Sequence, residues 1–133
     1  MDEAIIKYDE RGNCIYYEYY MGLKIWWEHD ENNNMIYTKD SEDLKEVWQE
    51  FDKNNNLIYY KEDDLESWRG YDENNNEIHS KNSYGFENWY KYNENNEQIE
   101  ITQQEFKQIE RNKAKQKLYL NNKRINRFEI MDI

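Results

Sequence analysis

The chain has 133 residues, a net charge of −11, no proline and a single cysteine, so it fits one domain or one repeat array and excludes a disulfide within the chain. Its acidity and few aliphatic residues would normally predict disorder. However, it contains 13 Tyr, 5 Trp and 4 Phe, and each aromatic ring can bury on the order of 150–250 Å². We therefore expect a thin, ordered structure with half-exposed aromatic residues.

An internal repeat of about 21 residues occupies the first hundred positions. In each copy an aromatic residue or histidine, which we call the anchor, precedes an Asn-rich turn and stands seven residues before an isoleucine. The anchors are Tyr8, His29, Phe51, Tyr71 and Tyr92, and the isoleucines are Ile15, Ile36, Ile58, Ile78 and Ile99. Three residues before the last four anchors stand Trp26, Trp48, Trp68 and Trp89. Such a period is typical of one small unit stacked on copies of itself.

Each copy is predicted to be a β-hairpin, because two short β-prone runs flank an Asn cluster. Asparagine tolerates the positive φ that tight turns require. At the position where later copies carry Asn33, Asn55, Asn75 and Asn96, the first copy carries Gly12, which predicts a left-handed turn residue. Residues 1–101 are therefore expected to form an acidic array of five hairpins, a meandering antiparallel sheet in which residues 3–9 are the N-terminal capping strand.

The spacing of three between each tryptophan and its anchor leaves two arrangements open. In a straight strand the two side chains point to opposite faces, so both faces would carry aromatic residues. Alternatively, a β-bulge realigns them. Because aliphatic residues are too few for a second layer, we expect a largely single-layer, strongly twisted sheet with aromatic ladders.

A short helix is predicted to follow the array. Thr102 and Glu105 have the spacing of a capping box, which predicts a helix over residues 103–112 with Phe106 and Ile109 on one face.

A closing hairpin is predicted after this helix. Residues 115–120 and 124–131 flank the pair Asn121-Asn122, and the hairpin would cover the last open edge of the sheet. Residues 102–133 would thus form a basic helix-plus-hairpin cap of the same domain. The predicted fold class is mainly β, a β-hairpin repeat sheet with a short C-terminal helix and a closing hairpin.

No pattern in the sequence predicts catalysis. Segments that begin at Asp30, Asp52 and Asp72 match the start of a calcium loop, but they lack its glycine at position six and its glutamate at position twelve. His29 and His79 fall on strand positions of the repeat, and no glycine-rich phosphate loop, zinc spacing or nucleophile elbow occurs. We therefore expect no enzymatic activity, no metal and no cofactor.

Charge is divided unevenly along the chain. Residues 1–101 hold 10 Lys/Arg and 25 Asp/Glu, whereas residues 102–133 hold 8 Lys/Arg and 4 Asp/Glu. The acidic array should repel nucleic acid and attract a basic protein surface, although the charge would equally keep an aromatic-rich sheet soluble. The basic segment could pair with the acidic array of a second copy, which leaves a homodimer open.

Aromatic side chains beyond those that the hairpins require are candidates for partner binding, because Tyr and Trp dominate binding hot spots. The alternative is that they only pack across strands. The predicted partner-binding set, which includes three carboxylates, is Tyr16, Tyr17, Tyr19, Tyr20, Trp27, Tyr59, Tyr60, Tyr90, Asp63, Asp64 and Glu66.

The sequence predicts a cytoplasmic location. It carries no signal peptide and no apolar run long enough to cross a membrane. A single cysteine is typical of proteins from reducing compartments.

One segment of the repeat resembles the choline-binding and cell-wall-binding repeats. The string Trp26-Trp27-Glu28-His29-Asp30, followed by Asn33 and Met35, is similar to the Trp-Tyr-Tyr-Phe-Asp motif of that family, and the likeness covers roughly residues 23–100. The resemblance implies hairpins that bind choline or a glycan through aromatic cages.

A closer resemblance is to the Tyr-Asp-Glu-Asn-Gly-Asn hairpin repeats of small proteins from bacteriophages and mobile elements. The matching segments are residues 8–15, 71–78 and the related 51–58. The MORN-type antitoxin repeats are similar in period and more distant. The resemblance implies a phage or mobile-element accessory protein, which would act in the host cell cytoplasm.

These features favour a non-enzymatic inhibitor of a nucleic-acid-binding host defence complex, of the anti-CRISPR type. Its carboxylates would mimic nucleic acid in a basic groove, and its aromatic side chains would anchor the contact. One alternative is a cytoplasmic immunity protein or antitoxin that neutralises a toxin. Another is a choline- or glycan-binding repeat module.

Overall fold

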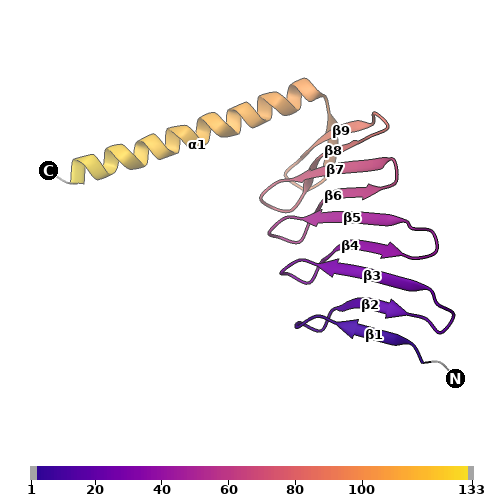
Figure 1. The fold of residues 1–133 in the computed structure, drawn as a ribbon. Coiled ribbons are helices and arrows are strands. Elements are labelled where there is room, and N and C mark those ends of the chain that lie inside the picture. Colours follow the sequence, from indigo (N-terminus) through magenta and orange to yellow (C-terminus); the bar gives the residue numbers. More distant parts are fainter. Residues whose placement is uncertain (1–2, 132–133) are drawn as a thin grey trace. The chain divides into compact units, whose positions relative to one another are not determined.

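The computed structural model describes residues 3–131, with side chains described for residues 3–124. Within this range the fold is mainly β, as predicted, with ten antiparallel strands that neighbour one another in sequence order and one helix (Figure 1). The elements are β1 (Ile5–Tyr8), β2 (Cys14–Glu18), β3 (Lys24–His29), β4 (Met35–Asp40), β5 (Glu46–Phe51), β6 (Leu57–Glu62), β7 (Leu65–Tyr71), β8 (Glu77–Asn82), β9 (Glu87–Tyr92), β10 (Gln98–Ile101) and α1 (Gln103–Met131). The chain divides into two units, the array unit (Met1–Glu87) and the C-terminal unit (Asn88–Ile133).

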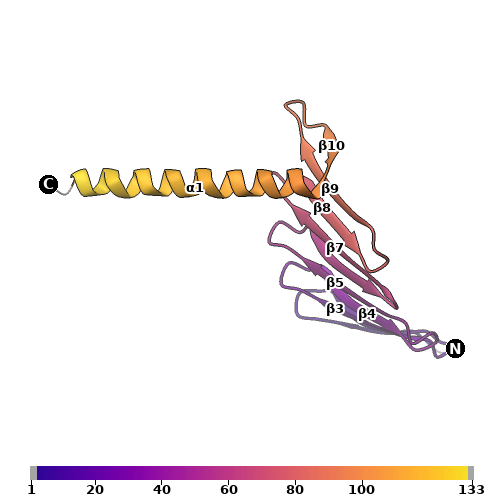
Figure 2. The same cartoon turned by 90° about the horizontal axis from the view of Figure 1, so that it is seen from above.

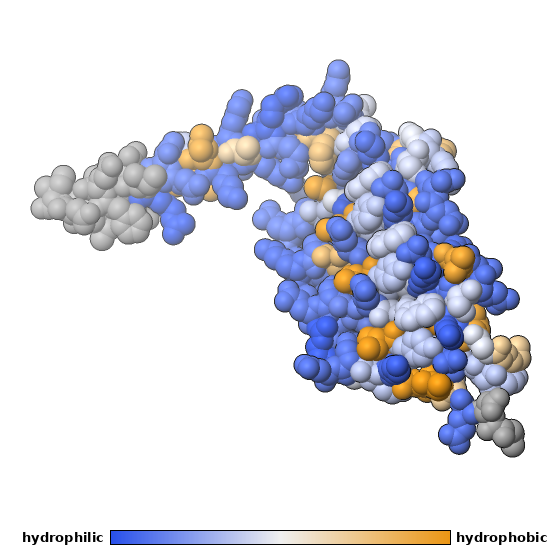
Figure 3. All heavy atoms as spheres, in the orientation of Figure 1, coloured by the Kyte–Doolittle hydropathy of each residue, from blue (hydrophilic) through white to orange (hydrophobic). Residues whose placement is uncertain are grey.

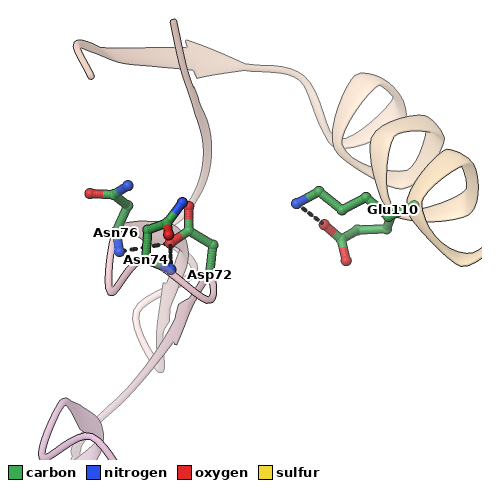
Figure 4. A network of polar contacts seen from close by, with 5 residues as sticks. Asp72, Asn74, Asn76 and Glu110 are labelled. Atoms are coloured by element: carbon green, nitrogen blue, oxygen red, sulfur yellow. Dashed lines mark hydrogen bonds and ion pairs between the residues drawn. The ribbon is translucent and has the colours of Figure 1, made fainter. Parts of the chain in front are cut away.

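An aspartate organises each Asn-rich turn of the array unit. In the turn after β5, the Asp52 Oδ1 atom accepts hydrogen bonds from the backbone N–H groups of Asn54 and Asn56, each at 2.9 Å. Figure 4 shows the same arrangement at Asp72. The fourth residue of each turn has a positive φ, which is 88° at Gly12, 68° at Asn33, 66° at Asn55 and 66° at Asn75. The predicted left-handed position is therefore confirmed.

Asparagine side chains link successive turns along one edge of the array unit. The Nδ2–Oδ1 hydrogen bonds run from Asn13 to Asn33 at 2.8 Å, from Asn34 to Asn55 at 2.8 Å and from Asn56 to Asn75 at 2.9 Å. In every case the acceptor is the left-handed residue of the next turn. Gly12 occupies the first turn of the described residues, where no earlier turn donates to a side-chain oxygen, so glycine suffices there.

A β-bulge occupies the isoleucine position of the repeat in each hairpin of the array unit. Between β3 and β4, Glu28 pairs with Tyr37 and His29 pairs with Met35, so Ile36 is the extra residue. The equivalent extra residues are Ile15, Ile58 and Ile78. Because the bulge lies on the second strand of the hairpin, the first strand keeps its alternation, and register places each tryptophan and its anchor on opposite faces. The sheet therefore has bulges and also carries aromatic residues on both faces, so the two arrangements that the spacing left open occur together.

The array unit is a single layer, as its sparse aliphatic composition predicts (Figures 1 and 2). Among the described residues, the only buried side chain is Ile101, in the C-terminal unit, which is 9% exposed. Most strand residues of the array unit are half-buried. Burial is thus spread over many aromatic and aliphatic side chains instead of being concentrated in a core.

The C-terminal unit contains β9 from Asn88 onward, β10 and α1. The Thr102 Oγ1 atom accepts a hydrogen bond from the Glu105 backbone N–H at 3.1 Å, which confirms the predicted start of the helix. The predicted helix end at residue 112 and the closing hairpin over residues 115–131 are wrong, because α1 continues to Met131. Across the described part of the chain, no helix combines the length and the apolar composition that a membrane span requires.

Local composition explains why a helix forms where a hairpin was predicted. Residues 103–131 contain neither Gly nor Pro, and residues 113–120 consist mostly of Lys, Ala, Gln and Leu, which favour helix. In the array, an aspartate three residues before the left-handed position holds each turn together. Leu118 stands at that distance before Asn121, so the Asn121-Asn122 pair has no carboxylate to stabilise a turn, and the helix continues through it.

Candidate functional site

Register places three tryptophans and three tyrosines on one face of the array unit, which we call the tryptophan face. The cross-strand pairs, each between neighbouring hairpins, are Tyr16–Trp26, Tyr37–Trp48 and Tyr59–Trp68. Their ring centroids lie 5.8, 5.5 and 5.8 Å apart, with the rings tilted. The three tryptophans remain 36%, 37% and 38% exposed. The pairs therefore join successive hairpins and still leave each indole ring accessible.

Charged residues flank the aromatic pairs in a repeating order. Across β3 to β7 the directly paired residues are Glu28, Tyr37, Trp48, Lys61 and Glu66. The next row repeats this order as Glu50, Tyr59, Trp68 and Lys81. The Lys61 Nζ atom lies 5.6 Å from the Trp48 ring centroid, within the range of a cation–π contact. Trp48 thus has a tyrosine ring on one side and an ammonium group on the other.

Carboxylates hold the tyrosine hydroxyls of this face in place. The Tyr37 hydroxyl donates to Glu46 at 2.5 Å, and the Tyr59 hydroxyl donates to Glu66 at 2.8 Å. The hydrogen bond to Glu46 is the main cause that raises the pKa of Tyr37 to about 12. The hydrogen bond to Glu66 likewise raises the pKa of Tyr59. Both tyrosine side chains are therefore held in place on the tryptophan face, and their hydroxyls stay protonated at neutral pH.

Two other carboxylates of the tryptophan face have no such role. Among the described residues, neither Glu28 nor Glu50 has a hydrogen-bond or ion-pair partner, and both are exposed. Glu28 nevertheless lies beside the aromatic rings, since it pairs directly with Tyr37 across the hairpin. Its charge adds to the effect of the hydrogen bond to Glu46 in raising the pKa of Tyr37. These two carboxylates are available to a ligand without the loss of an internal contact.

Two shallow hollows adjoin each other on this face. The Trp26 hollow, of about 510 Å³, is lined among others by Trp26, Glu28, Ile36 and Tyr37. The Trp48 hollow, of about 410 Å³, is lined among others by Trp48, Glu50 and Tyr59, and it shares Glu28, Ile36 and Tyr37 with its neighbour. The bulge at Ile36 thus supplies an apolar wall to both hollows.

In the fourth hairpin, two residues of the tryptophan face differ from those of the earlier hairpins. Gly70 stands where the earlier copies carry Glu28 and Glu50, and it pairs with His79, which takes the tyrosine position. The His79 Nε2 atom lies 2.7 Å from a carboxylate oxygen of Glu87. In the fourth hairpin, the residue at the tyrosine position, His79, thus still contacts a carboxylate. The exposed carboxylate that Glu28 and Glu50 provide in the earlier hairpins is replaced by Gly70.

The predicted partner-binding residues do not form one surface. The tryptophan face contains Tyr16, Tyr59 and Glu66, whereas register places Tyr17, Trp27 and Tyr60 on the opposite face. The turn after β2 contains Tyr19 and Tyr20, 41% and 69% exposed. The turn between β6 and β7 consists of Asp63 and Asp64, and Tyr90 lies in the C-terminal unit.

Tyr60 belongs to a contact network at the edge opposite the Asn-rich turns. Its hydroxyl donates to Glu62, which also forms an ion pair with Lys45. The hydrogen bond from Lys45, followed by that from Tyr60, lowers the pKa of Glu62. Here a predicted binding residue has a structural role within the sheet.

Sequence reasoning missed the main features of the tryptophan face. It assigned the tryptophans to the needs of the hairpin, and the abundance of acidic residues concealed the two carboxylates without partners. A usable signal was the order Trp-x-Glu, which recurs at residues 26–28 and 48–50 and ends at residues 68–70 with Gly70. Period-two alternation puts both members of this motif on one face of a strand.

The surface of the array unit combines apolar and charged areas. Figure 3 shows pale and orange residues over its strands and blue, hydrophilic residues along one edge. Within the described range, no group of three or more His, Cys, Asp or Glu residues is placed to hold a metal ion. Comparison of the chain with models of known protein families and with curated protein sequences gives no match.

Proposed function

We propose that the protein is a non-enzymatic binding protein that docks its tryptophan face on a basic protein surface. The observation that carries this proposal is the exposure of three tryptophans beside two carboxylates, Glu28 and Glu50, that have no partner among the described side chains. Aromatic side chains of this type dominate binding hot spots, and unpaired carboxylates can accept charge-assisted hydrogen bonds from Lys or Arg. A surface with these features is suited to a cationic partner.

The charge of the whole unit supports the same kind of partner. Residues 1–87 hold 9 Lys/Arg and 22 Asp/Glu. Such a field repels nucleic acid and accelerates association with a basic surface, especially at low salt. Basic grooves of this kind occur on proteins that hold nucleic acid. The proposed activity is therefore inhibition of a nucleic-acid-binding host complex by occupation of its groove, in the host cytoplasm and in the manner of an anti-CRISPR protein.

The test compares a matched pair of variants in capture from a nuclease-treated host lysate. Glu28→Gln/Glu50→Gln removes the two unpartnered carboxylates, and Glu31→Gln/Glu73→Gln removes the same charge from exposed turn positions. The wild type and the turn variant should retain a nucleic-acid-binding complex, and the first variant should lose it. Gel-shift assays should then show that wild-type protein displaces nucleic acid from the captured complex. Continued nucleic-acid binding at saturating inhibitor would refute the proposal.

An aromatic-lined surface also favours a second candidate, a choline- or glycan-binding module. The Trp26 and Trp48 hollows each combine indole and phenol rings, which attract quaternary ammonium groups and sugar faces. In that case choline or an oligosaccharide should change the tryptophan fluorescence at millimolar concentration. An immunity protein would use the same acidic surface, and the identity of the captured partner, a toxin, would distinguish it.

A further inference from the structure

The first strand of the array unit has an open edge. Among the described residues β1 pairs with β2 alone, and it lies at the end of the strand order (Figure 1). All of its residues are exposed, with Ile5 at 49% and Ile6 at 42%, whereas β2 to β8 consist mostly of half-buried residues. Such an edge presents backbone N–H and C=O groups with which another strand can pair.

Neighbouring hairpins of the array unit pair opposite charges where they meet. At each of their three junctions, register places a lysine directly opposite a glutamate, two residues from the Tyr–Trp pair. The lysine–glutamate pairs are Lys24–Glu18, Lys39–Glu46 and Lys61–Glu66. Opposite charges at paired positions favour the pairing of two strands, and like charges oppose it. Glu3 stands at the same position relative to Ile5, which takes the tryptophan position in the first copy, so the open edge also carries such a charge.

Backbone hydrogen bonding determines which residues near β1 face the open edge. The Asp9 N–H donates across the first hairpin to a backbone carbonyl at 2.9 Å, so the backbone of Asp9 faces β2. Alternate residues of an antiparallel strand bond to opposite neighbours, and the bulge of this hairpin lies on β2. The backbone groups of Ile5 and Lys7 therefore also face β2. Those of Ala4 and Ile6 face the open edge, where an added strand would bond to them.

We infer that this edge binds the same edge of a second copy in antiparallel orientation, so that two arrays form one continuous sheet. Ile6 of each copy exchanges backbone hydrogen bonds with Ala4 of the other. Ile5 then lies opposite Ile5 of the second copy. At both ends of the contact, Lys7 lies opposite Glu3 of the second copy. The segment from Glu3 to Lys7 is thus complementary to itself when it runs antiparallel.

Charge selects this register among the alternatives. The pairing can shift only in steps of two residues, because outward-facing residues must pair with each other. A shift in one direction places Lys7 opposite Ile5, and a shift in the other places Glu3 opposite Ile5. The Asp9 carboxylate is already used, because it accepts two backbone hydrogen bonds in the first turn. Only the proposed register gives each lysine a glutamate.

Lys7 has an alternative role, since a lysine on an edge strand can prevent pairing. Its Nζ atom lies 5.2 Å from the centroid of the Tyr16 ring. Neither Lys7 nor Glu3 has an ion-pair partner among the described residues. An ammonium group carries three donors, so the contact to the ring is compatible with an added carboxylate. The two roles predict opposite association states, which makes them separable by experiment.

The contact closes on itself and therefore produces dimers. A two-fold axis perpendicular to the sheet relates the copies, so both use the same edge and both tryptophan faces lie on one side. The last strand in the order, β10, carries Glu100 but no basic residue, so it lacks the same complementarity. The inference does not rest on the proposed function, because Glu28 and Glu50 lie outside β1.

Sedimentation velocity of the full-length protein over about 5–500 µM tests the contact. Because the paired segment is short, we expect a reversible dimer with a Kd on the order of 10–100 µM. Lys7→Glu should raise this Kd at least about tenfold, because it places two glutamates opposite each other at both ends of the contact. Lys53→Glu makes the same charge change at an exposed turn position, and as the control it should change the Kd by less than about twofold.

A reciprocal exchange of charge tests the register. Glu3→Lys should weaken the dimer by a similar factor, although it lowers the net negative charge, because two lysines then oppose each other. An equimolar mixture of the Glu3→Lys and Lys7→Glu variants should restore dimerisation, since each lysine again lies opposite a glutamate. Circular dichroism melts check that both variants are folded.

Three results would overturn the inference. A wild type that stays monomeric at about 500 µM would show that Lys7 protects the edge instead of pairing it. A dimer that both single variants retain unchanged would place the contact elsewhere, for example between the basic helix of one copy and the acidic array of the other. A mixture of the two variants that remains monomeric would exclude the pairing of Lys7 with Glu3.

Discussion

The array unit and the C-terminal unit use different sources of stability. In the array unit, hairpins contact each other through Tyr–Trp pairs on one face and through Asn–Asn hydrogen bonds at one edge. In the C-terminal unit, α1 satisfies its own backbone, and all of its described side chains from Glu110 to Arg124 are exposed. A hairpin of the array therefore depends on its neighbours for stability, whereas the helix depends on the helix propensity of its own residues.

The fifth hairpin, in the C-terminal unit, shares only part of the geometry of the array hairpins. Its turn repeats the array geometry, since Asn93 Oδ1 accepts hydrogen bonds from the N–H groups of Asn95 and Glu97 and Asn96 has a φ of 62°. Its strands nevertheless pair without a bulge, with Ile99 opposite Lys91. A shared turn therefore does not by itself produce the bulge.

The largest expected effect comes from breaking a contact between hairpins. Trp48→Ala removes the ring that touches Tyr37 and Lys61, and it should lower the free energy of unfolding by about 2–3 kcal/mol, less than for a fully buried tryptophan because the ring is 37% exposed. Urea unfolding followed by near-ultraviolet circular dichroism measures this value.

The matched change in the other unit should have almost no effect. Leu118 is 64% exposed on α1, so Leu118→Ala should change the stability by less than about 0.5 kcal/mol. Equal losses of stability for Trp48→Ala and Leu118→Ala would show that the array unit does not depend more on contacts between its elements than the helix does.

The second effect concerns the asparagine link at the turn edge. The Asn34 side chain donates to both Asp30 and Asn55, so Asn34→Ala should cost about 1–2 kcal/mol. Asn32 lies in the same turn but contributes only its backbone N–H, so Asn32→Ala is the control and should be nearly neutral. Thermal melts of the two variants give the comparison, and similar midpoints would exclude the asparagine link as a source of stability.

The contrast between the units also explains what the sequence could predict. The hairpins and the left-handed positions were predictable because the Asp and Asn side chains that build each turn lie within five residues of one another. The bulges at the isoleucines depend on how the two strands of a hairpin pair, and the spacing of tryptophan and anchor left a straight strand and a bulge both open. The exposure of Glu28 and Glu50 depends on packing against neighbouring hairpins, which no single copy of the repeat encodes. The pair Asn121-Asn122 was misinterpreted because its composition resembles a turn but it lacks the organising aspartate.

A third, smaller effect is expected from His29. Its Nδ1 atom is buried without a hydrogen-bond partner among the described residues, which costs free energy. The next copy of the repeat carries Phe51 at the same anchor position. His29→Phe should therefore raise the stability by about 1 kcal/mol, and a melting temperature below that of the wild type would contradict this account.

The smallest effect per site is expected from acid, and it distinguishes the turns of the two units. The backbone N–H of Asn13 is the main cause that lowers the pKa of Asp9 below its ordinary value of 3.8, and that of Asn56 does the same for Asp52. Because the pKa values are lower in the folded state, these carboxylates stabilise the array unit above about pH 4 and lose that contribution as the pH falls through the folded values. In the C-terminal unit the same position is Asn93, which does not titrate.

Acid titration should therefore loosen the turns of the array unit, while the turn between β9 and β10, which Asn93 organises, keeps its hydrogen bonds. Asp52→Asn transfers the neutral turn of the C-terminal unit into the array, because an Asn side-chain oxygen accepts the same two N–H bonds at Asn93. The variant should be slightly less stable than the wild type at pH 7, since the charge-assisted hydrogen bonds become neutral ones, and it should lose less stability between pH 5 and pH 3. Amide hydrogen exchange of Asn54 and Asn56 at the two pH values reads out the turn directly. If the variant and the wild type lose the same protection on acidification, the carboxylate of the turn is not the acid-sensitive group of the array.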